Sequence, residues 1–258
     1  MIFDTHIHLN DERLINNLDE YLSDARGLGI TDFLCVGWDI ESSKNAIELA
    51  HKFNGVYAAI ALMPTEWKQY NKETINELRE LAKDNLVVAI GEIGLDYYWE
   101  KNDEIKAIQK EMFIEQIKLA NELNLPVSIH CRDAYQDCLD IVRSFHVKRK
   151  SVMHCYSGSL EMGREFIRNN FALAFGGTLT FKNSKNAQNT FLNIDINSIV
   201  FETDAPYLAP QKFRGQINIP KYIYETILFA SSLRNMDFED FQKQIYKNSK
   251  EIFSRENI

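Results

Sequence analysis

The sequence predicts an α/β fold in which residues 1–258 form a single (β/α)8 barrel of the TIM type with additional C-terminal helices. Three observations support this prediction. Eight short apolar, β-branched runs recur along the chain, amphipathic helical stretches separate them, and the length suits one barrel. Strands that alternate with helices form a parallel sheet through right-handed crossovers. Eight such units favour closure into a barrel over the alternative, an open sheet with helices on both faces.

The predicted strands are short runs in which valine, isoleucine, phenylalanine and alanine are frequent. In chain order they are Ile2–His6, Asp32–Val36, Val56–Leu62, Val87–Gly91, Val127–His130, Ser151–His154, Phe171–Phe175 and Ile199–Thr203. Three of these runs end in a histidine, which directs attention to their carboxyl ends.

The predicted helices lie between these strands and carry apolar residues at helical period. Ser42 is suited to an N-cap, and Gly29 to a C-cap. The helical stretches are Leu14–Gly29, Ser42–Phe53, Thr74–Lys83, Asp103–Leu123, Ala134–Phe145 and Leu160–Arg168, with a short turn near Asn186–Leu192. Two further helices, Lys221–Ser232 and Asp237–Phe253, follow the last strand and are expected to pack on the barrel.

The composition is that of an acidic protein, with a net charge of −8 and a pI of about 5.3. This charge argues against a broad basic surface that coats nucleic acid, but not against local contacts to a few phosphates. The first residues lack the basic and apolar regions of a signal peptide, and no apolar run is long enough to cross a membrane. We therefore expect a cytoplasmic protein.

The four cysteines form no CxxC pair, which argues against a zinc ribbon. Cys131 and Cys155 each follow a histidine directly. Since adjacent side chains of a strand point to opposite faces, we expect these two thiols to lie outside the barrel, under the helices, as small buried apolar groups.

Six side chains that can bind metal fall at the predicted carboxyl ends of strands one, four, five, six and eight. They are His6, His8, Glu92, His130, His154 and Asp204. Each alone could be a hydrogen-bonded structural residue, but active sites of barrel enzymes form at this rim. The joint placement of all six at one rim predicts a metal site.

Six ligands exceed the three or four protein ligands of one catalytic zinc ion, and they suit two divalent ions that share a carboxylate. Glu92 is the natural bridge. One ion would take His6, His8 and Asp204, and the other would take His130 and His154. No dinucleotide-binding glycine motif, P-loop or serine nucleophile elbow competes with this interpretation.

The motifs around these residues resemble those of the TatD family of metal-dependent deoxyribonucleases nearly end to end. The matching segments are Asp4–Asn10, Gly91–Tyr98, Leu125–Ala134, His154–Gly158 and Glu202–Pro210, followed by Arg214-Gly215, Asn218 and Pro220. The resemblance implies that the same six residues bind two Mg²⁺, Mn²⁺ or Zn²⁺ ions.

The activity implied by the resemblance is hydrolysis of DNA phosphodiester bonds, often as a 3′→5′ exonuclease, so that the expected partner is single-stranded DNA or a 3′ end. The alternative is D-aminoacyl-tRNA deacylation or hydrolysis of another ester or amide. We expect a monomer. Three positions depart from the family pattern and remove polar groups near the metals: Met63, Phe213 and Ile219.

The expected chemistry assigns roles to residues beside the ligands. We expect Asp204 to accept the proton of the attacking water as general base, while Glu202 orients that water or a histidine. Arg132 and Arg214 are candidates for phosphate contacts, although Arg132 could instead pair with Asp133.

Aromatic side chains after Glu92 offer a second means of holding substrate. Tyr97, with Tyr98 and Trp99, could stack on bases or merely pack the loop. A protein that binds nucleic acid or another protein without turnover is the non-enzymatic alternative.

Overall fold

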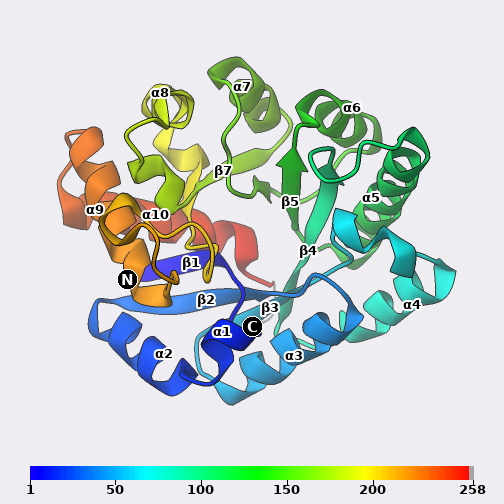
Figure 1. Cartoon of the computed structure of the whole chain (residues 1–258), viewed down its shortest axis with the longest axis horizontal. Helices are drawn as coiled ribbons and strands as arrows, with labels where there is room; N and C mark the ends of the chain where they lie inside the picture. The colour runs from blue at the N-terminus through cyan, green and yellow to red at the C-terminus, as the bar shows by residue number, and fades with distance from the viewer. Residues whose placement is uncertain (256–258) are drawn as a thin grey trace.

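Eight parallel strands pair in the order of the sequence, and helices surround them (Figure 1). The computed structural model describes residues 1–255, so that 256–258 of the expected domain lie outside the described residues. The strands are β1 (Ile2–Ile7), β2 (Ile30–Val36), β3 (Val56–Ile60), β4 (Val87–Asp96), β5 (Val127–Arg132), β6 (Ser151–Met153), β7 (Phe171–Phe175) and β8 (Ile199–Phe201). The predicted α/β barrel and its eight strands are confirmed.

Helices follow most strands. They are α1 (Glu12–Ile15), α2 (Leu18–Gly27), α3 (Ile40–Lys52), α4 (Lys72–Leu81), α5 (Asp103–Leu123), α6 (Tyr135–Phe145), α7 (Leu160–Arg168), α8 (Lys185–Asn193), α9 (Ile223–Leu233) and α10 (Phe238–Phe253). Short 3-10 turns lie at η1 (Pro64–Gln69), η2 (Gly177–Thr180), η3 (Ile196–Ser198), η4 (Gln211–Phe213) and η5 (Pro220–Tyr222). The stretch expected as one helix, Leu14–Gly29, is instead two, because Asn17 leaves the helical conformation.

The barrel closes at a seam between β8 and β1, where the described strands share no regular ladder. Separate hydrogen bonds take its place. Thr5 Oγ1 donates to the Phe201 carbonyl at 2.9 Å, and the Asp204 amide donates to the His6 carbonyl at 2.9 Å. The barrel is therefore nearly closed, and the loop after β8 supplies part of the closure.

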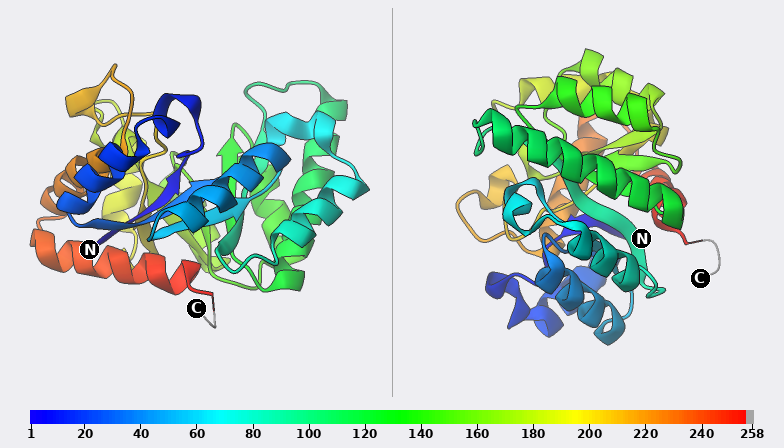
Figure 2. Two further views of the ribbon diagram at one scale, coloured as in Figure 1. Left: turned by 90° about the horizontal axis from the view of Figure 1, so that it is seen from below. Right: turned by 90° about the vertical axis from the view of Figure 1, so that its right-hand side faces the viewer.

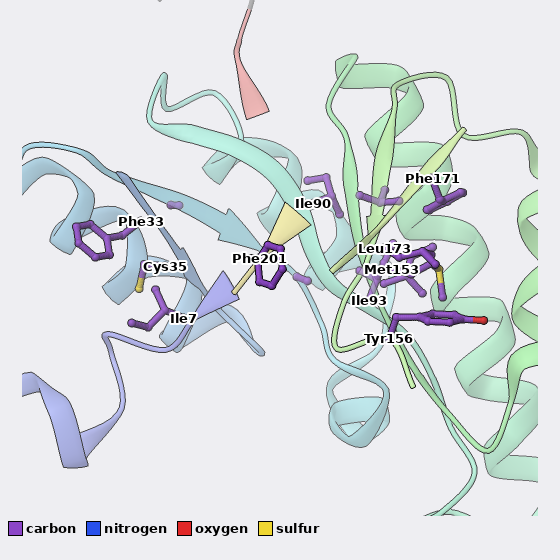
Figure 3. Close-up of a cluster of buried hydrophobic side chains, with 14 of the residues drawn as sticks. Ile7, Phe33, Cys35, Ile90, Ile93, Met153, Tyr156, Phe171, Leu173 and Phe201 are labelled. Carbon is purple, nitrogen blue, oxygen red and sulfur yellow. The ribbon is translucent and has the colours of Figure 1, made fainter. Parts of the chain in front are cut away.

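Apolar side chains pack in two layers. The larger cluster fills the space between strands and helices and includes Phe33, Ile93 and Phe171 (Figure 3). The smaller cluster draws mainly small residues from the strands, such as Ala59, Ala174 and Val200. Burial of both layers fixes where each strand ends, and hence where the residues after each strand lie.

Helix α10 lies across the end of the barrel at which β1 begins (Figure 2). Its residues Ile252 and Phe253 join the smaller cluster, and the Phe253 ring lies 5.7 Å from that of Phe3. Residues at the carboxyl ends of the strands thus face the opposite, open end. Among the described residues, no helix has the length and apolar character needed to span a bilayer.

Candidate metal centre

The six residues predicted as ligands converge at the open end of the barrel. His6 lies in β1 with His8 just after it, Glu92 and His130 lie in β4 and β5, and His154 and Asp204 follow β6 and β8. The side chains of His6, His8, Glu92 and His154 are buried, while His130 and Asp204 are partly accessible.

Glu92 lies at the centre of the cluster, and its two oxygens face different imidazoles. Oε2 lies 3.5 Å from His6 Nε2, whereas Oε1 lies 2.8 Å from His130 Nδ1 and 3.7 Å from His154 Nε2. Two groups whose ligand atoms lie within 4.8 Å of one another therefore share this carboxylate: His6–His8–Glu92 and Glu92–His130–His154. This is the arrangement in which one carboxylate can serve two ions.

Asp204 closes the other side of the cluster. Its Oδ1 lies 3.5 Å from His8 Nε2 and 3.9 Å from the Nε2 atoms of both His6 and His154. The same carboxylate borders the cavity described below, so that it faces both the imidazoles and the space open to a substrate.

Two glycines explain how Glu92 reaches this position. A Cβ atom on Gly91 would lie 2.7 Å from Ser128 Cβ, and one on Gly94, where φ is +138°, would lie 2.0 Å from the His130 carbonyl oxygen. Only glycine permits such close approach. The β4–β5 register is also irregular between Ile90 and Ile93. The sequence had predicted that Glu92 lies at the end of a shorter strand. Glu92 instead lies inside β4, which continues to Asp96.

Each imidazole turns one nitrogen toward the cluster and the other toward an outer acceptor. The outer contacts are His8 Nδ1 to the Val36 carbonyl at 3.2 Å, His6 Nδ1 to Ser128 Oγ at 3.5 Å, His130 Nε2 to Asp96 Oδ2 at 3.0 Å and His154 Nδ1 to Glu202 Oε1 at 2.9 Å. The last pair is close, but its angle does not meet hydrogen-bond geometry. A proton held on the outer nitrogen leaves a lone pair on the inner one, as metal binding requires.

The charges of the cluster fit bound cations. Burial alone would lower the pKa of His130 and His154, but facing carboxylates outweigh it and raise these pKa values to about 9 and about 10. His6 Nε2 is fully buried and has no hydrogen-bond partner. Within residues 1–255, no lysine or arginine pairs with Glu92 or Asp204. The carboxylates that favour a positive charge on these imidazoles would attract a divalent ion in the same way, and nitrogen and oxygen atoms are suitable ligands for one.

A cavity of about 970 Å³ opens above the cluster. His8, Glu92, His130, His154 and Asp204 form the wall with the candidate ligands, and the other walls combine small polar residues with aromatic and basic ones. These other residues include Trp38, Trp99, Phe181 and Tyr207, together with Arg132 and Lys185. The volume suits a ligand of the size of one or a few nucleotides or a similar small molecule.

Arg132 borders this cavity, as expected of a phosphate contact. Its guanidinium lies 3.8 Å from the centre of the Tyr98 ring and 5.6 Å from that of Trp99. No ion pair joins it to Asp133 among the described residues. Arg214, the second candidate, is exposed over the Phe181 ring at 4.8 Å and lies outside the lining of the cavity.

Tyr97 lies outside the cavity lining, and its surroundings favour the alternative expected for it, packing of the loop, over contact with a substrate. Its hydroxyl donates to Asp137 Oδ2 at 2.7 Å, and its ring packs on the core cluster. Trp99, two residues on, borders the cavity instead. A carboxylate that the sequence interpretation missed explains this turn: Asp96 accepts the amides of Tyr98 and Trp99 at 3.0 Å.

The cysteine prediction is wrong for Cys155. Strand β6 ends at Met153, and Cys155 has a φ of +45°, so the alternation of strand faces no longer applies there. Cys155 and Cys131 are both half-buried and border the cavity, although Cys131 also packs against the outer core.

Glu202 does not border the cavity. It is fully buried, and its Oε1 accepts the Cys155 amide at 2.8 Å. Together with the 2.9 Å approach to His154, this contact favours a role in orienting that histidine over a role in orienting water.

The three residues that depart from the family pattern, Met63, Phe213 and Ile219, lie in different environments. Met63 borders the cavity. Phe213 stacks on Tyr222, with ring centres 3.8 Å apart, and Ile219 packs against the core. Of the three, only Met63 changes the surface that faces a substrate.

A parallel barrel with an imidazole–carboxylate cluster at the carboxyl ends of its strands defines the class of metal-dependent hydrolase barrels. The family model described as TatD related DNase matches residues 3–254. A Bacillus subtilis protein described as uncharacterized metal-dependent hydrolase YabD is 38% identical over 254 residues, with 98% of this chain and 99% of that protein covered. The chain therefore belongs to the TatD family of metal-dependent hydrolases.

Solved structures share the fold of this chain. YJJV, a TatD homolog from Escherichia coli, superposes with a TM-score of 0.92 at 25% identity, with 98% of this chain and 97% of that chain covered. A TatD family hydrolase from Entamoeba histolytica superposes with a TM-score of 0.84 at 20% identity, again with 98% and 97% covered.

Proposed function

We propose that the chain is a two-metal hydrolase that cleaves phosphodiester bonds at the 3′ ends of single-stranded DNA, acting as a monomer. The observation that carries this proposal is the shared position of Glu92, which belongs to both ligand groups. His6, His8 and Asp204 would hold one ion, His130 and His154 the other, and Glu92 both. Divalent ions at such a site supply Lewis acidity, which acidifies water and neutralises charge on phosphoryl oxygens.

The chain's own residues perform the remaining steps. Asp204 borders the cavity and accepts a proton from the attacking water, while its contact with His8 holds the carboxylate in place. Glu202 and Asp96 keep His154 and His130 in the orientation described above. Arg132, which lines the cavity, contacts the phosphate. Arg214 lies outside the cavity and contacts the part of a longer DNA substrate that extends beyond it.

The residues that line the cavity suit a DNA substrate with unpaired bases. Trp38, Trp99, Phe181 and Tyr207 offer ring faces or edges to a base, whereas the chain carries a net charge of −8. Stacking on aromatic rings tolerates any base sequence and needs no broad basic surface. A duplex would have to fray before its end could use these walls.

The proposal is tested with end-labelled single-stranded DNA, double-stranded DNA, RNA and D-aminoacyl-tRNA, each with Mn²⁺ or Mg²⁺ and with a chelator. Stepwise shortening of single-stranded DNA from its 3′ end is the expected result. Turnover of the aminoacyl ester without DNA cleavage would instead assign a deacylase.

Asp204→Asn tests the general base. We expect turnover to fall by roughly a hundredfold or more, because general bases contribute on this scale. Asp195→Asn is the matched control, since Asp195 caps η3 just before the same strand and lies at its other end. Equal activity of Asp204→Asn and wild type would exclude the proposed role.

A further inference from the structure

The loop after β8 holds Asp204 in a backbone conformation that few non-glycine residues adopt. Asp204 has a φ of +56°, in the left-handed region that residues with a Cβ atom seldom adopt. Within the loop, the Tyr207 amide donates to the Asp204 carbonyl at 2.8 Å. A strained residue of this kind persists only where the surrounding structure holds it.

The amide of Asn218 bridges this loop from one side of Asp204 to the other. Its Nδ2 donates to the Thr203 carbonyl at 2.8 Å and to the Tyr207 carbonyl at 2.7 Å. The Asn218 backbone amide also donates to the Pro206 carbonyl at 3.1 Å. The side chain is 1% exposed, so that water cannot replace these bonds.

On the other side, β1 holds the same loop. The Asp4 carboxylate accepts the Thr203 amide at 2.8 Å and the Thr203 hydroxyl at 2.6 Å. Thr203 is thus held between Asp4 and Asn218, and the next residue in the chain is Asp204. This contact belongs to the seam of the barrel, so the closure of the barrel and the position of Asp204 depend on the same bonds.

We infer that Asn218 is a positioning residue for Asp204: it fixes the backbone on both sides and so sets the 3.5 Å approach of Oδ1 to His8 Nε2. Asn218 lies outside the cavity lining and the ligand set, and acts only through the loop. The inference rests on the proposed role of Asp204 as a metal ligand.

Asn248 provides a matched control, because it binds the chain at the start of β8, whereas Asn218 binds the loop that follows the end of β8. It is also 1% exposed, and its Nδ2 also donates to two carbonyls, those of Ile196 at 2.7 Å and Ile199 at 2.8 Å. These carbonyls lie at the start of β8, away from the ligands. A change at Asn248 therefore removes the same two donated bonds, and one more that its Oδ1 accepts from Gln244 Nε2 at 2.8 Å, without reaching Asp204.

The experiment compares Asn218→Leu with Asn248→Leu in the full chain, because leucine is close in size to asparagine and has no polar donor. Thermal unfolding and calorimetric titration with Mn²⁺ are measured for both variants and for Asp204→Asn. Both leucine variants should unfold at lower temperature. Only Asn218→Leu should bind Mn²⁺ more weakly, by roughly tenfold or more, as is typical when a group that supports a ligand is removed.

Two outcomes overturn the inference in distinguishable ways. If Asp204→Asn binds Mn²⁺ as wild type does, Asp204 is not a ligand and the proposed site fails. If Asp204→Asn weakens binding but Asn218→Leu and Asn248→Leu share one affinity, Asn218 has only a structural role. Should either leucine variant not fold, Asn218→Ser and Asn248→Ser repeat the comparison, because serine retains one donor. The expected result is then a smaller loss of affinity, again only at position 218.

Discussion

The two ends of the barrel bury carboxylates in opposite ways. At the end covered by α10, Asp32 is 6% exposed and accepts bonds from Lys250 Nζ at 3.1 Å and the Tyr246 hydroxyl at 3.0 Å. At the open end, Glu92 is 3% exposed and faces only imidazoles. A buried carboxylate needs a compensating positive charge. A lysine compensates Asp32 permanently, whereas the imidazoles that face Glu92 can give up their protons to a divalent ion, and this difference separates a structural acid from a functional one.

Glu92→Gln should cause the largest effect at the open end. The amide keeps the shape of the side chain but removes the negative charge that both ligand groups share. We expect one of two bound ions to be lost and turnover to fall roughly a thousandfold, since metal-centred charge stabilisation is worth several kcal/mol. Metal analysis and kinetics check this prediction. Two ions bound at wild-type affinity would show that Glu92 is not the bridge.

Metal removal should lower stability next most strongly. Ions that bind the folded chain stabilise it, by about 2.7 kcal/mol when their concentration is 100 times Kd. Chelator-treated protein should therefore unfold at lower denaturant concentration, and added Mn²⁺ should restore the midpoint. A midpoint that does not respond to Mn²⁺ would mean that the open end needs no external cation.

Asp96→Asn should weaken metal binding by about tenfold, because it removes the charge that holds the outer nitrogen of His130. Asp84→Asn is the matched control. Asp84 also contacts a histidine, with Oδ2 2.7 Å from His51 Nε2, but that pair lies on the surface. Titration with Mn²⁺ of both variants measures the difference, and equal affinities would remove Asp96 from the site.

Lys250→Met should have a smaller effect than these changes, a loss of about 1–2 kcal/mol of unfolding free energy without change in Mn²⁺ affinity, because Lys250 is partly exposed. Lys44→Met, which breaks the exposed pair with Glu77, should cost less still. Denaturant titrations measure both. Reduced Mn²⁺ affinity in Lys250→Met would show that the two ends are not independent.

The pH dependence of the Lys250 contribution has a defined sign. Burial acts to lower the pKa of Lys250, but the bonds to Asp32 outweigh it and raise this pKa above its usual value. The contribution is therefore complete below the pKa of an unfolded-chain lysine and is lost as the pH rises through the higher folded-state pKa. The stability difference between wild type and Lys250→Met should shrink in that alkaline range.

Elements with a strong repeating pattern could be predicted from the sequence. All eight strands are present, and α5 has the predicted bounds, Asp103–Leu123, because a long helix with periodic apolar residues has few alternatives. The first helix was predicted as continuous, yet Asn17 divides it. The length of β4 was also underestimated, because close contact with β5 at Gly91 and Gly94 extends it past Glu92.

The candidate ligands could be found from the sequence because parallel strands bring their carboxyl ends to one rim. Loop residues could not be placed in the same way. Tyr97 and Trp99 are two positions apart, but the bonds of Asp96 and Asp137 decide which one borders the cavity. Asn218 belongs to a matching family segment, but the sequence did not indicate its role, because its partners are backbone carbonyls rather than side chains.

The order of strands and helices and the identity of the acidic and imidazole groups were determined by the sequence alone, because hydrophobic periodicity is a local property of the chain. Tertiary structure alone decided which oxygen of Glu92 faces which histidine, how the seam between β8 and β1 holds Asp204, and which buried acid faces a lysine. These features depend on contacts between residues as far apart as Asp4 and Thr203, and local sequence patterns carry no information about the distance between such residues.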